Sequence, residues 1–357
     1  MATIKLRLIN CSLISVSLII LFSAQLYAQD CTSSEDCYQK GTTNNFTSQS
    51  IALLDKALKL AKKEKINPAK IYCQRGIKWL NGRSSKDALK DFEAAIKSDP
   101  TFFLAYKMKA NIFKVQEKNY EKTDKFLKET IKTFPNNPEA VYEKAQNHLY
   151  YNKTDLAYTD FETAYNMLVM MMDGTDQIDT NTKGNICKWY AISYMKKNNL
   201  YVYDARALEI LESGKNFSPD SPVMLGELVM AYYDNGRLQE ATTVGNKAVS
   251  LDEETYKSKN VGGNFIVGIK AFEDKDYFKS ASHLNYAIAN ISNPHPLIYY
   301  YAGLANWFHY YYNAPKLWSS HVAQIKNQLE MAYKYGQGTK YDFYAQDAKK
   351  RIPDLKF

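Results

Sequence analysis

The sequence lacks the short motifs that most often mark an enzyme. It contains no H-E-x-x-H zinc motif, no P-loop, no nucleophile elbow and no dinucleotide-binding glycine pattern. The stretch VGGNFIVG, residues 261–268, does not have the spacing that cradles phosphate, and we interpret it as a turn between repeats. The five histidines have no cysteine or carboxylate at metal-ligand spacing. We therefore predict a protein that is not an enzyme and that has no metal or cofactor site.

Cysteine is scarce, with five residues in 357 and no C-x-x-C pair, which excludes a zinc ribbon and a thioredoxin-type redox pair. Four cysteines follow the N-terminal segment, and four allow three disulfide connectivities. Cys31 and Cys37 stand close enough in sequence to close a small loop. We interpret Cys73 and Cys187, which fall within predicted helices, as buried free thiols.

Charge of one sign is never concentrated, and long apolar runs are missing after the first 28 residues. The chain has 46 basic and 38 acidic residues, interspersed along predicted helical faces without a dense Lys/Arg block. This pattern predicts no nucleic-acid partner. No later stretch approaches the roughly 20 apolar residues needed to span a bilayer, so we predict no transmembrane segment in the mature chain.

Residues 1–28 have the pattern of a secretory signal peptide. Lys5 and Arg7 form a basic start, CSLISVSLIILF supplies the apolar stretch, and small residues precede a cleavage position after Ala28. An uncleaved anchor is the alternative, but the apolar stretch is short for it. Asp30, directly before Cys31, argues against a lipoprotein. We predict export as a soluble protein to a periplasm or an outer surface.

A stripe of small, large and small residues marks one face of a predicted helix over residues 84–100. Ala88, Phe92 and Ala95 are four and seven positions apart, so they share a helix face. The Asp-Pro pair that ends at Pro100 terminates the helix. Gly76, twelve residues upstream, allows a partner helix to pack at short range. The stretch therefore predicts the second helix of a tight antiparallel pair.

The same stripe occurs seven times in all, with its first residues spaced by 38, 35, 34, 50, 34 and 39 positions. Its members are Ser50–Leu54–Ala57, Ala88–Phe92–Ala95, Thr123–Leu127–Thr130, Ala157–Phe161–Ala164, Ala207–Leu211–Gly214, Ala241–Gly245–Ala248 and Ser280–Leu284–Ala287. An eighth first helix carries Gly303 in the place of Gly76. This pattern resembles the tetratricopeptide repeat (TPR) family. The resemblance implies an all-α, right-handed superhelical solenoid of about seven to eight helix–turn–helix pairs.

The spacing of 50 between Ala157 and Ala207 interrupts the repeat. We therefore predict N-terminal TPR-like repeats over 29–172, a polar joint loop over 173–183, and C-terminal repeats with a capping helix over 184–357. The resemblance implies that the concave face of such a solenoid binds a segment of a partner protein. One family mode grips a C-terminal carboxylate, and Lys107 and Asn111 match its lysine–asparagine pair by spacing. Glu139 and Glu143 stand where that mode needs positive charge, so the sequence does not match this binding mode. We therefore interpret Lys107 as a solvated groove residue.

Tyrosine is abundant, with 29 residues, several of them consecutive near the C-terminus. By phase with the small-residue column, Tyr300, Leu304, Trp307 and Phe308 are predicted to project towards the concave face. Tyr142, Gln146 and Tyr150 form a sparser strip on the matching face. Packing against a neighbouring repeat is the alternative for the C-terminal group. Aromatic rings with polar tips are favoured at recognition surfaces.

Two hypotheses follow from this sequence. The first is a non-enzymatic scaffold or adaptor of the cell envelope that binds a partner protein through its concave groove, as the resemblance implies. The second is a carbohydrate-binding helical-repeat protein, because aromatic platforms also stack on sugar rings. Tryptophan fluorescence separates the two, since Trp307 and Trp318 lie in the aromatic stretch.

Overall fold

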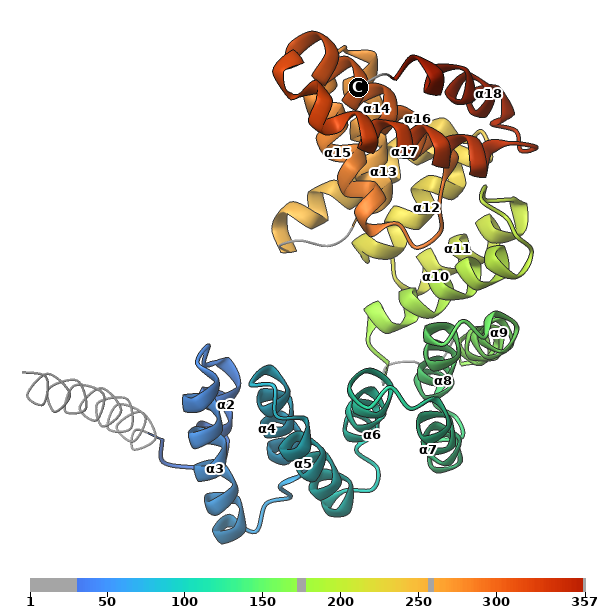
Figure 1. Ribbon diagram of the computed structural model, residues 1–357. Coiled ribbons are helices and arrows are strands. Elements are labelled where there is room, and N and C mark those ends of the chain that lie inside the picture. The colour runs from blue at the N-terminus through green and yellow to red at the C-terminus, as the bar shows by residue number, and fades with distance from the viewer. Residues whose placement is uncertain (1–30, 172–177, 256–259, 356–357) are drawn as a thin grey trace, which may run out of the picture. The chain divides into compact units, whose positions relative to one another are not determined.

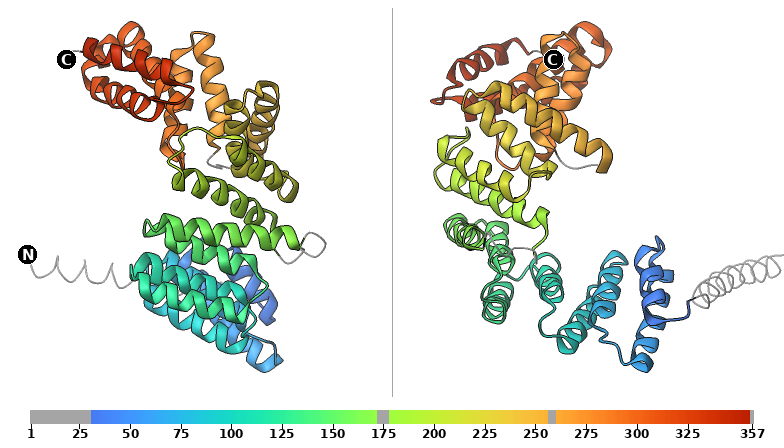
Figure 2. Two further views of the ribbon diagram at one scale, coloured as in Figure 1. Left: turned by 90° about the vertical axis from the view of Figure 1, so that its right-hand side faces the viewer. Right: turned by 180° about the vertical axis from the view of Figure 1, so that it is seen from behind.

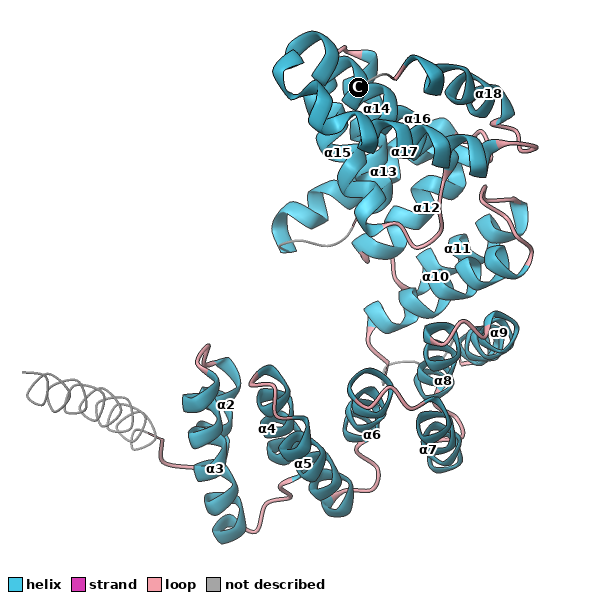
Figure 3. Cartoon of the chain, in the orientation of Figure 1, coloured by secondary structure: helices cyan, strands magenta, loops and turns pink. Residues whose placement is uncertain are grey.

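The computed structural model describes residues 31–171, 178–255 and 260–355 (Figure 1), and the predicted signal peptide lies outside these ranges. Within them all regular structure is helical (Figure 3), which confirms the predicted all-α class. The chain divides into two compact units, residues 1–143 and 144–357. This division falls within a helix upstream of the predicted joint. Each unit is built from successive helices that pack in pairs (Figures 1 and 2).

The first unit contains two complete helix pairs, α2–α3 and α4–α5, followed by the less regular α6–α7. The short helix α6 runs directly into a π-helical turn, η1. The bounds of these helices, and of α8, in which the unit ends, are α2 Ser34–Thr43, α3 Thr47–Glu64, α4 Ala69–Asn81, α5 Ser85–Ser98, α6 Phe103–Asn111, η1 Ile112–Gln116, α7 Tyr120–Thr133 and α8 Pro138–Tyr150.

The second unit continues the pairing to the C-terminus, where α18 packs against α17 and α16. Its elements are α9 Thr154–Met170, α10 Thr180–Lys197, α11 Ala205–Phe217, α12 Pro222–Asp234, α13 Leu238–Thr255, α14 Val261–Glu273, α15 Tyr277–Asn290, α16 Pro296–Phe308, η3 His309–Asn313, η4 Pro315–Leu317, α17 Trp318–Gly336, α18 Asp342–Arg351 and η5 Ile352–Asp354. Of the predicted loop 173–183, residues 173–177 lie outside the described ranges and residues 180–183 form the first turn of α10.

The column of small residues holds the helix pairs together, as predicted. Every residue of the seven stripes is buried. A Cβ atom added at Gly76 in α4 would lie 2.6 Å from the ring of Phe92 in α5, which leaves no space for a side chain. Gly268 faces Leu284 in the same way, and Gly303 faces Leu329. The small residues therefore allow the close helix approach that the spacing predicts.

The interpretation of VGGNFIVG as a turn is wrong, because these residues form the first two turns of α14. The side chain of Asn260 caps the helix by accepting a hydrogen bond from the Gly263 N–H at 2.8 Å. A Cβ at Gly262 would lie 2.0 Å from the backbone oxygen of Gly226 in α12. The glycine serves a close backbone-to-backbone contact between two helices, which local turn signals do not distinguish from a loop.

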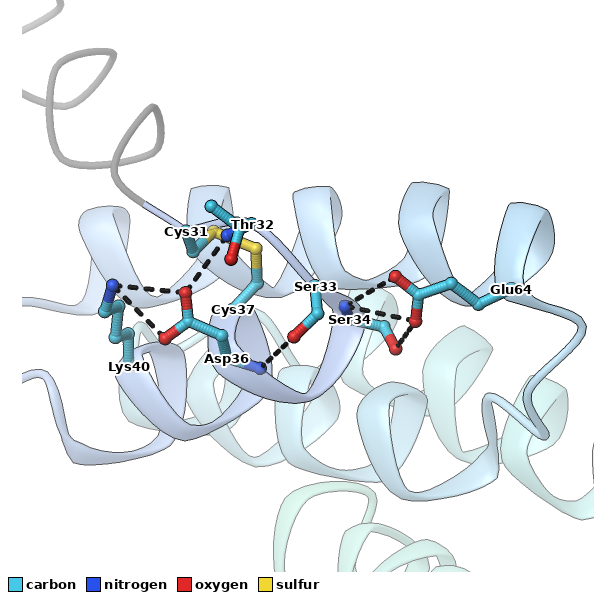
Figure 4. Close-up of a disulfide and its surroundings, with 8 residues drawn as sticks. All are labelled: Cys31, Thr32, Ser33, Ser34, Asp36, Cys37, Lys40 and Glu64. Atoms are coloured by element: carbon cyan, nitrogen blue, oxygen red, sulfur yellow. Dashed lines mark hydrogen bonds and ion pairs between the residues drawn. A yellow bond between two sulfur atoms is a disulfide. The ribbon is translucent and has the colours of Figure 1, made fainter.

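The four cysteines within the described ranges form one disulfide and two buried thiols. Cys31 and Cys37 form a disulfide next to the start of α2 (Figure 4). In the same figure the Ser33 side chain caps α2 by accepting from the Asp36 N–H at 3.1 Å, and Ser34 bonds to Glu64 of α3. Cys73 and Cys187 are free and buried, as predicted, and burial raises the pKa of each thiol to about 12. Both thiols are therefore protonated and poorly reactive at neutral pH.

Candidate interaction surfaces

Lys107 on α6 forms ion pairs, which contradicts the prediction that it is a solvated groove residue. Its Nζ lies 2.6 Å from Oε1 of Glu139 and 3.5 Å from Oε1 of Glu143, both on α8. Burial acts to lower the pKa of Lys107, but the two carboxylates outweigh burial and raise it. Burial raises the pKa of Glu143. Asn111 follows one turn later on α6 and is half-buried. Lys107 is thus already engaged by carboxylates from this chain.

The strip on α8 presents little exposed surface. Tyr142 and Gln146 are half-buried, and burial raises the pKa of Tyr142. Tyr150, two turns along from Tyr142, is 48% exposed and lies 5.1 Å from the ring of Tyr151. Only the end of this predicted strip therefore offers a large side chain to a partner.

Tyr300 and Leu304 do not project towards a binding surface, which corrects the prediction for these two residues. Both are buried in the core formed by α16, α17 and α18. The Tyr300 hydroxyl donates to Oδ2 of Asp347 on α18 at 2.7 Å, and the same oxygen accepts from Nε of Arg351. The reason is that α18 packs back on α16, and no repeat motif in the sequence signals this contact.

Trp307 and Phe308 lie at the end of α16, where a group of aromatic rings reaches the surface. We define the aromatic tip as Trp307, Phe308, Tyr310, Tyr311, Tyr312 and Trp318. Its most exposed members are Tyr312, at 67%, and Tyr311, at 53%. The rings support one another: Tyr311 lies 5.3 Å from Trp318, and Phe308 lies 6.1 Å from Tyr312. The tip is therefore a connected aromatic surface with a half-buried base.

The backbone at the end of α16 explains why these rings are exposed. The helix widens into the π-helical turn η3, which closes with a hydrogen bond from the Ala314 N–H to the His309 carbonyl at 3.0 Å. Pro315 then opens the short 3₁₀ turn that leads into α17. Successive helical residues point about 100° apart, so three consecutive tyrosines cannot all face one core. Sequence analysis missed Tyr311 and Tyr312 as site residues, although the run itself signals them.

Another group of ionisable side chains meets inside the second unit. Asp234 accepts hydrogen bonds from the Tyr341 hydroxyl at 2.6 Å and from the Tyr203 N–H at 2.8 Å. Nε2 of His295 lies 3.0 Å from the same carboxylate. Burial and Asp234 raise the pKa of Tyr341. Both Asp234 and His295 are buried, and the carboxylate already bonds to groups of this chain. These contacts tie α12, α16 and the segment before α18 together.

The described ranges contain neither a cluster of residues able to hold a metal ion nor a helix with the length and apolar character to cross a bilayer. No protein family matches the chain, and no curated protein is similar to it.

Several solved structures are similar to the chain, and the three described next are each 14% identical to it. A TPR protein from Parabacteroides merdae aligns over 76% of this chain and 98% of its own, with a TM-score of 0.45. The anaphase-promoting complex assembly of Cut9 and Hcn1 aligns over 89% and 54%, with a TM-score of 0.49. PilF from Pseudomonas aeruginosa aligns over 60% and 88%, with a TM-score of 0.45.

Three features of the chain itself define its fold. Seven buried stripes recur at near-regular spacing, successive helices pack in pairs, and glycines at the crossing points leave no room for a Cβ. These are the features that the sequence pattern predicts. The chain is an all-α protein of repeated helix pairs, and its buried stripes resemble those of tetratricopeptide repeats.

Proposed function

We propose that this chain is a non-enzymatic adaptor of the cell envelope that binds another protein, with the aromatic tip as its principal contact. The observation that carries the proposal is the connected group of exposed rings at the end of α16. Single exposed apolar residues are normal, but a contiguous apolar patch marks an interaction site. Tyr and Trp are enriched among the residues that dominate binding energy at protein interfaces.

The half-buried base favours this use of the tip. Trp307 and Trp318 lie 6.4 Å apart and pack on the C-terminal core, so the outer rings are held in place before binding. Side chains that are already ordered lose less entropy when a partner covers them. Burial of one such ring contributes about 1.5–3 kcal/mol. Two or three rings therefore supply enough free energy for a specific, moderate-affinity contact.

The predicted groove residues are further proposed contacts: Lys107, Asn111 and Tyr142 in the first unit, and Gln146 and Tyr150 in the second. The exposed ring of Tyr150 is the most accessible of these side chains, while Lys107 is neutralised by its own carboxylate partners. A partner that carries a carboxylate would have to displace Glu139 from Lys107. We therefore assign these residues a smaller share of the binding energy than the aromatic tip.

Export is part of the proposal. The basic and apolar pattern of residues 1–28 supports it, and so does the disulfide between Cys31 and Cys37, because disulfides persist in oxidising compartments. The mature chain would then begin at Gln29 in a periplasm or at an outer surface. The mass of the protein purified from its native host tests this, since retention of residues 1–28 would contradict it.

Site-specific photocrosslinking in the native host tests the partner contact. A benzophenone amino acid replaces Tyr312 in one variant and Met170, which is 86% exposed on α9, in a matched control. We expect one protein to crosslink at position 312 and not at position 170. The same set of products from both positions, or none from position 312, would overturn the aromatic-tip assignment.

The carbohydrate-binding alternative uses the same rings, so it needs its own readout. Trp307 and Trp318 are half-buried beside the exposed tyrosines. A saturable change in tryptophan fluorescence on titration with purified envelope glycans, together with no protein crosslink at position 312, would favour a glycan ligand. Protein crosslinking without such a change would favour the adaptor.

A further inference from the structure

A cleft of about 640 Å³ opens among α12, α13, α14 and the start of α15. Its lining includes none of the aromatic-tip residues. Ile266 and Val267 of α14 line it and are half-buried, and Leu238 of α13, also in the lining, is 55% exposed. Pockets of roughly 300–1,000 Å³ with apolar walls are the usual size for binding a small ligand or a side chain. These walls therefore suit an aliphatic group.

Tyr233, in the last turn of α12, adds an aromatic ring to the lining. Its ring meets that of Phe265 edge-on at 5.0 Å, which holds it in place. Aromatic faces attract ammonium and guanidinium groups, and the aliphatic stems of Lys and Arg pack on apolar surface. An aromatic ring beside aliphatic side chains is thus a suitable surface for the stem and head of a basic side chain.

The charged residues in the lining carry a net charge of −1, which favours a cation. Three carboxylates, on Glu273, Asp274 and Asp276, stand against the ammonium groups of Lys270 and Lys279. Lys270 pairs with Asp274 at 2.8 Å, and Asp276 accepts from the Lys279 N–H at 3.1 Å as the N-cap of α15. Glu273 is exposed at the end of α14. A bound cation can therefore reach the Glu273 carboxylate without displacing Lys270 from Asp274.

We infer that this cleft is a second binding site that takes an arginine or lysine side chain from an apolar segment of a partner protein. The alkyl stem packs on Ile266, Val267 and Leu238, and the charged head pairs with Glu273 near the ring of Tyr233. A charge-assisted hydrogen bond of this kind is about twice as strong as a neutral one. The inference shares with the proposed function only the need for a protein partner, because it rests on residues outside the aromatic tip.

Peptide binding to the full mature chain tests the site. The probe is the capped peptide acetyl-Ser-Leu-Arg-Leu-Ser-amide, and its control replaces arginine with citrulline, which has the same shape and no charge. Calorimetric titration at low salt should give about ten-fold tighter binding of the arginine peptide. The variant Glu273→Gln should bring the two affinities together. Glu330→Gln, at an exposed carboxylate on α17 outside the cleft, should leave the ratio unchanged.

Three results would overturn the inference: equal affinity of the wild-type chain for both peptides, an unchanged ratio in Glu273→Gln, or no saturable binding of the arginine peptide below on the order of 1 mM. A Leu238→Ser variant adds a second check, because it should weaken both peptides equally. Circular dichroism of each variant confirms that the helices are retained. Photocrosslinking at position 312 is read separately, so the cleft and the aromatic tip can fail independently.

Discussion

The helix pairs α4–α5 and α16–α17 are built on the same contact but differ in the surface that they present. Gly76 packs on Phe92 in the first pair, and Gly303 packs on Leu329 in the second. On α4, Arg75 is bound by Asp91 of its own pair and by Asp55 of α3, so its charge is neutralised within the unit. The end of α16 instead carries the exposed rings of the aromatic tip. The comparison teaches that the repeat motif determines how helices pair, while the proposed recognition surface lies where the chain departs from that motif.

The largest expected effect tests a close glycine contact of the kind that both pairs use, here between α12 and α14. In Gly262→Ala the new Cβ would meet the Gly226 backbone oxygen at 2.0 Å, so helices α12 and α14 must move apart. We expect a loss on the order of 3 kcal/mol in the free energy of unfolding, measured by urea denaturation. Gly245→Ala is the control, because its nearest contact would be an ordinary 3.4 Å. A loss in the control as large as that in Gly262→Ala would contradict the packing argument.

A smaller effect should separate buried from exposed tyrosines at the C-terminus. Tyr300→Phe removes a hydroxyl that donates to Asp347 in the core, and we expect a loss of about 1 kcal/mol in the free energy of unfolding. Tyr312→Phe, at an exposed ring, should change it by less than about 0.5 kcal/mol. Equal effects in the two variants would show that the buried and exposed tyrosines are not distinct groups.

One carboxyl in each unit should respond to acid in the opposite direction from the other. Burial raises the pKa of Glu143 above 4.5, so the folded state favours the neutral carboxyl. Its stabilising contribution is full below pH 4.5 and is lost as the pH rises through the raised pKa. The wild type should therefore lose stability as the pH rises from 4.5 towards 7. Glu143→Gln should not show this loss.

Asp347 provides the opposite case in the second unit. Burial acts to raise its pKa, but hydrogen bonds from Arg351 and Tyr300 outweigh burial and lower it below 3.8. Its contribution is present above pH 3.8 and is lost as the pH falls through the lowered value. Asp347→Asn should make the free energy of unfolding less dependent on pH, and only in this acidic range. Thermal unfolding at a series of pH values measures each effect. The same pH dependence in both variants would contradict the contrast between the two carboxyls.

The smallest expected effect on stability belongs to the aromatic tip itself. Tyr311→Ser combined with Tyr312→Ser removes two exposed rings that contribute little to the core. We expect the free energy of unfolding to change by less than about 0.5 kcal/mol per residue. A loss of several kcal/mol, measured by urea denaturation, would mean that these rings serve packing and are not available to a partner.

The sequence predicts the helix pairs well because their signal is local. The spacing of Ala88, Phe92 and Ala95 determines one helix face, and the structure buries all three residues. The site is harder to predict, since exposure depends on contacts between distant residues. Tyr300 shares the phase of a groove residue, yet it is buried, and its hydroxyl donates to Asp347, 47 residues later. Gly262 shows the same limit. Its partner Gly226 lies on another helix, while the neighbouring glycines in the sequence indicate a turn.

Binding of the partner identified by photocrosslinking is the most direct test of the central claim. Its affinity is measured by calorimetry for the wild type, for the Tyr311→Ser/Tyr312→Ser double variant and for Tyr300→Phe. If the aromatic tip is the contact, the double variant loses at least about ten-fold in affinity and Tyr300→Phe binds like the wild type. Unchanged binding of the double variant, or a loss only in Tyr300→Phe, would contradict the account.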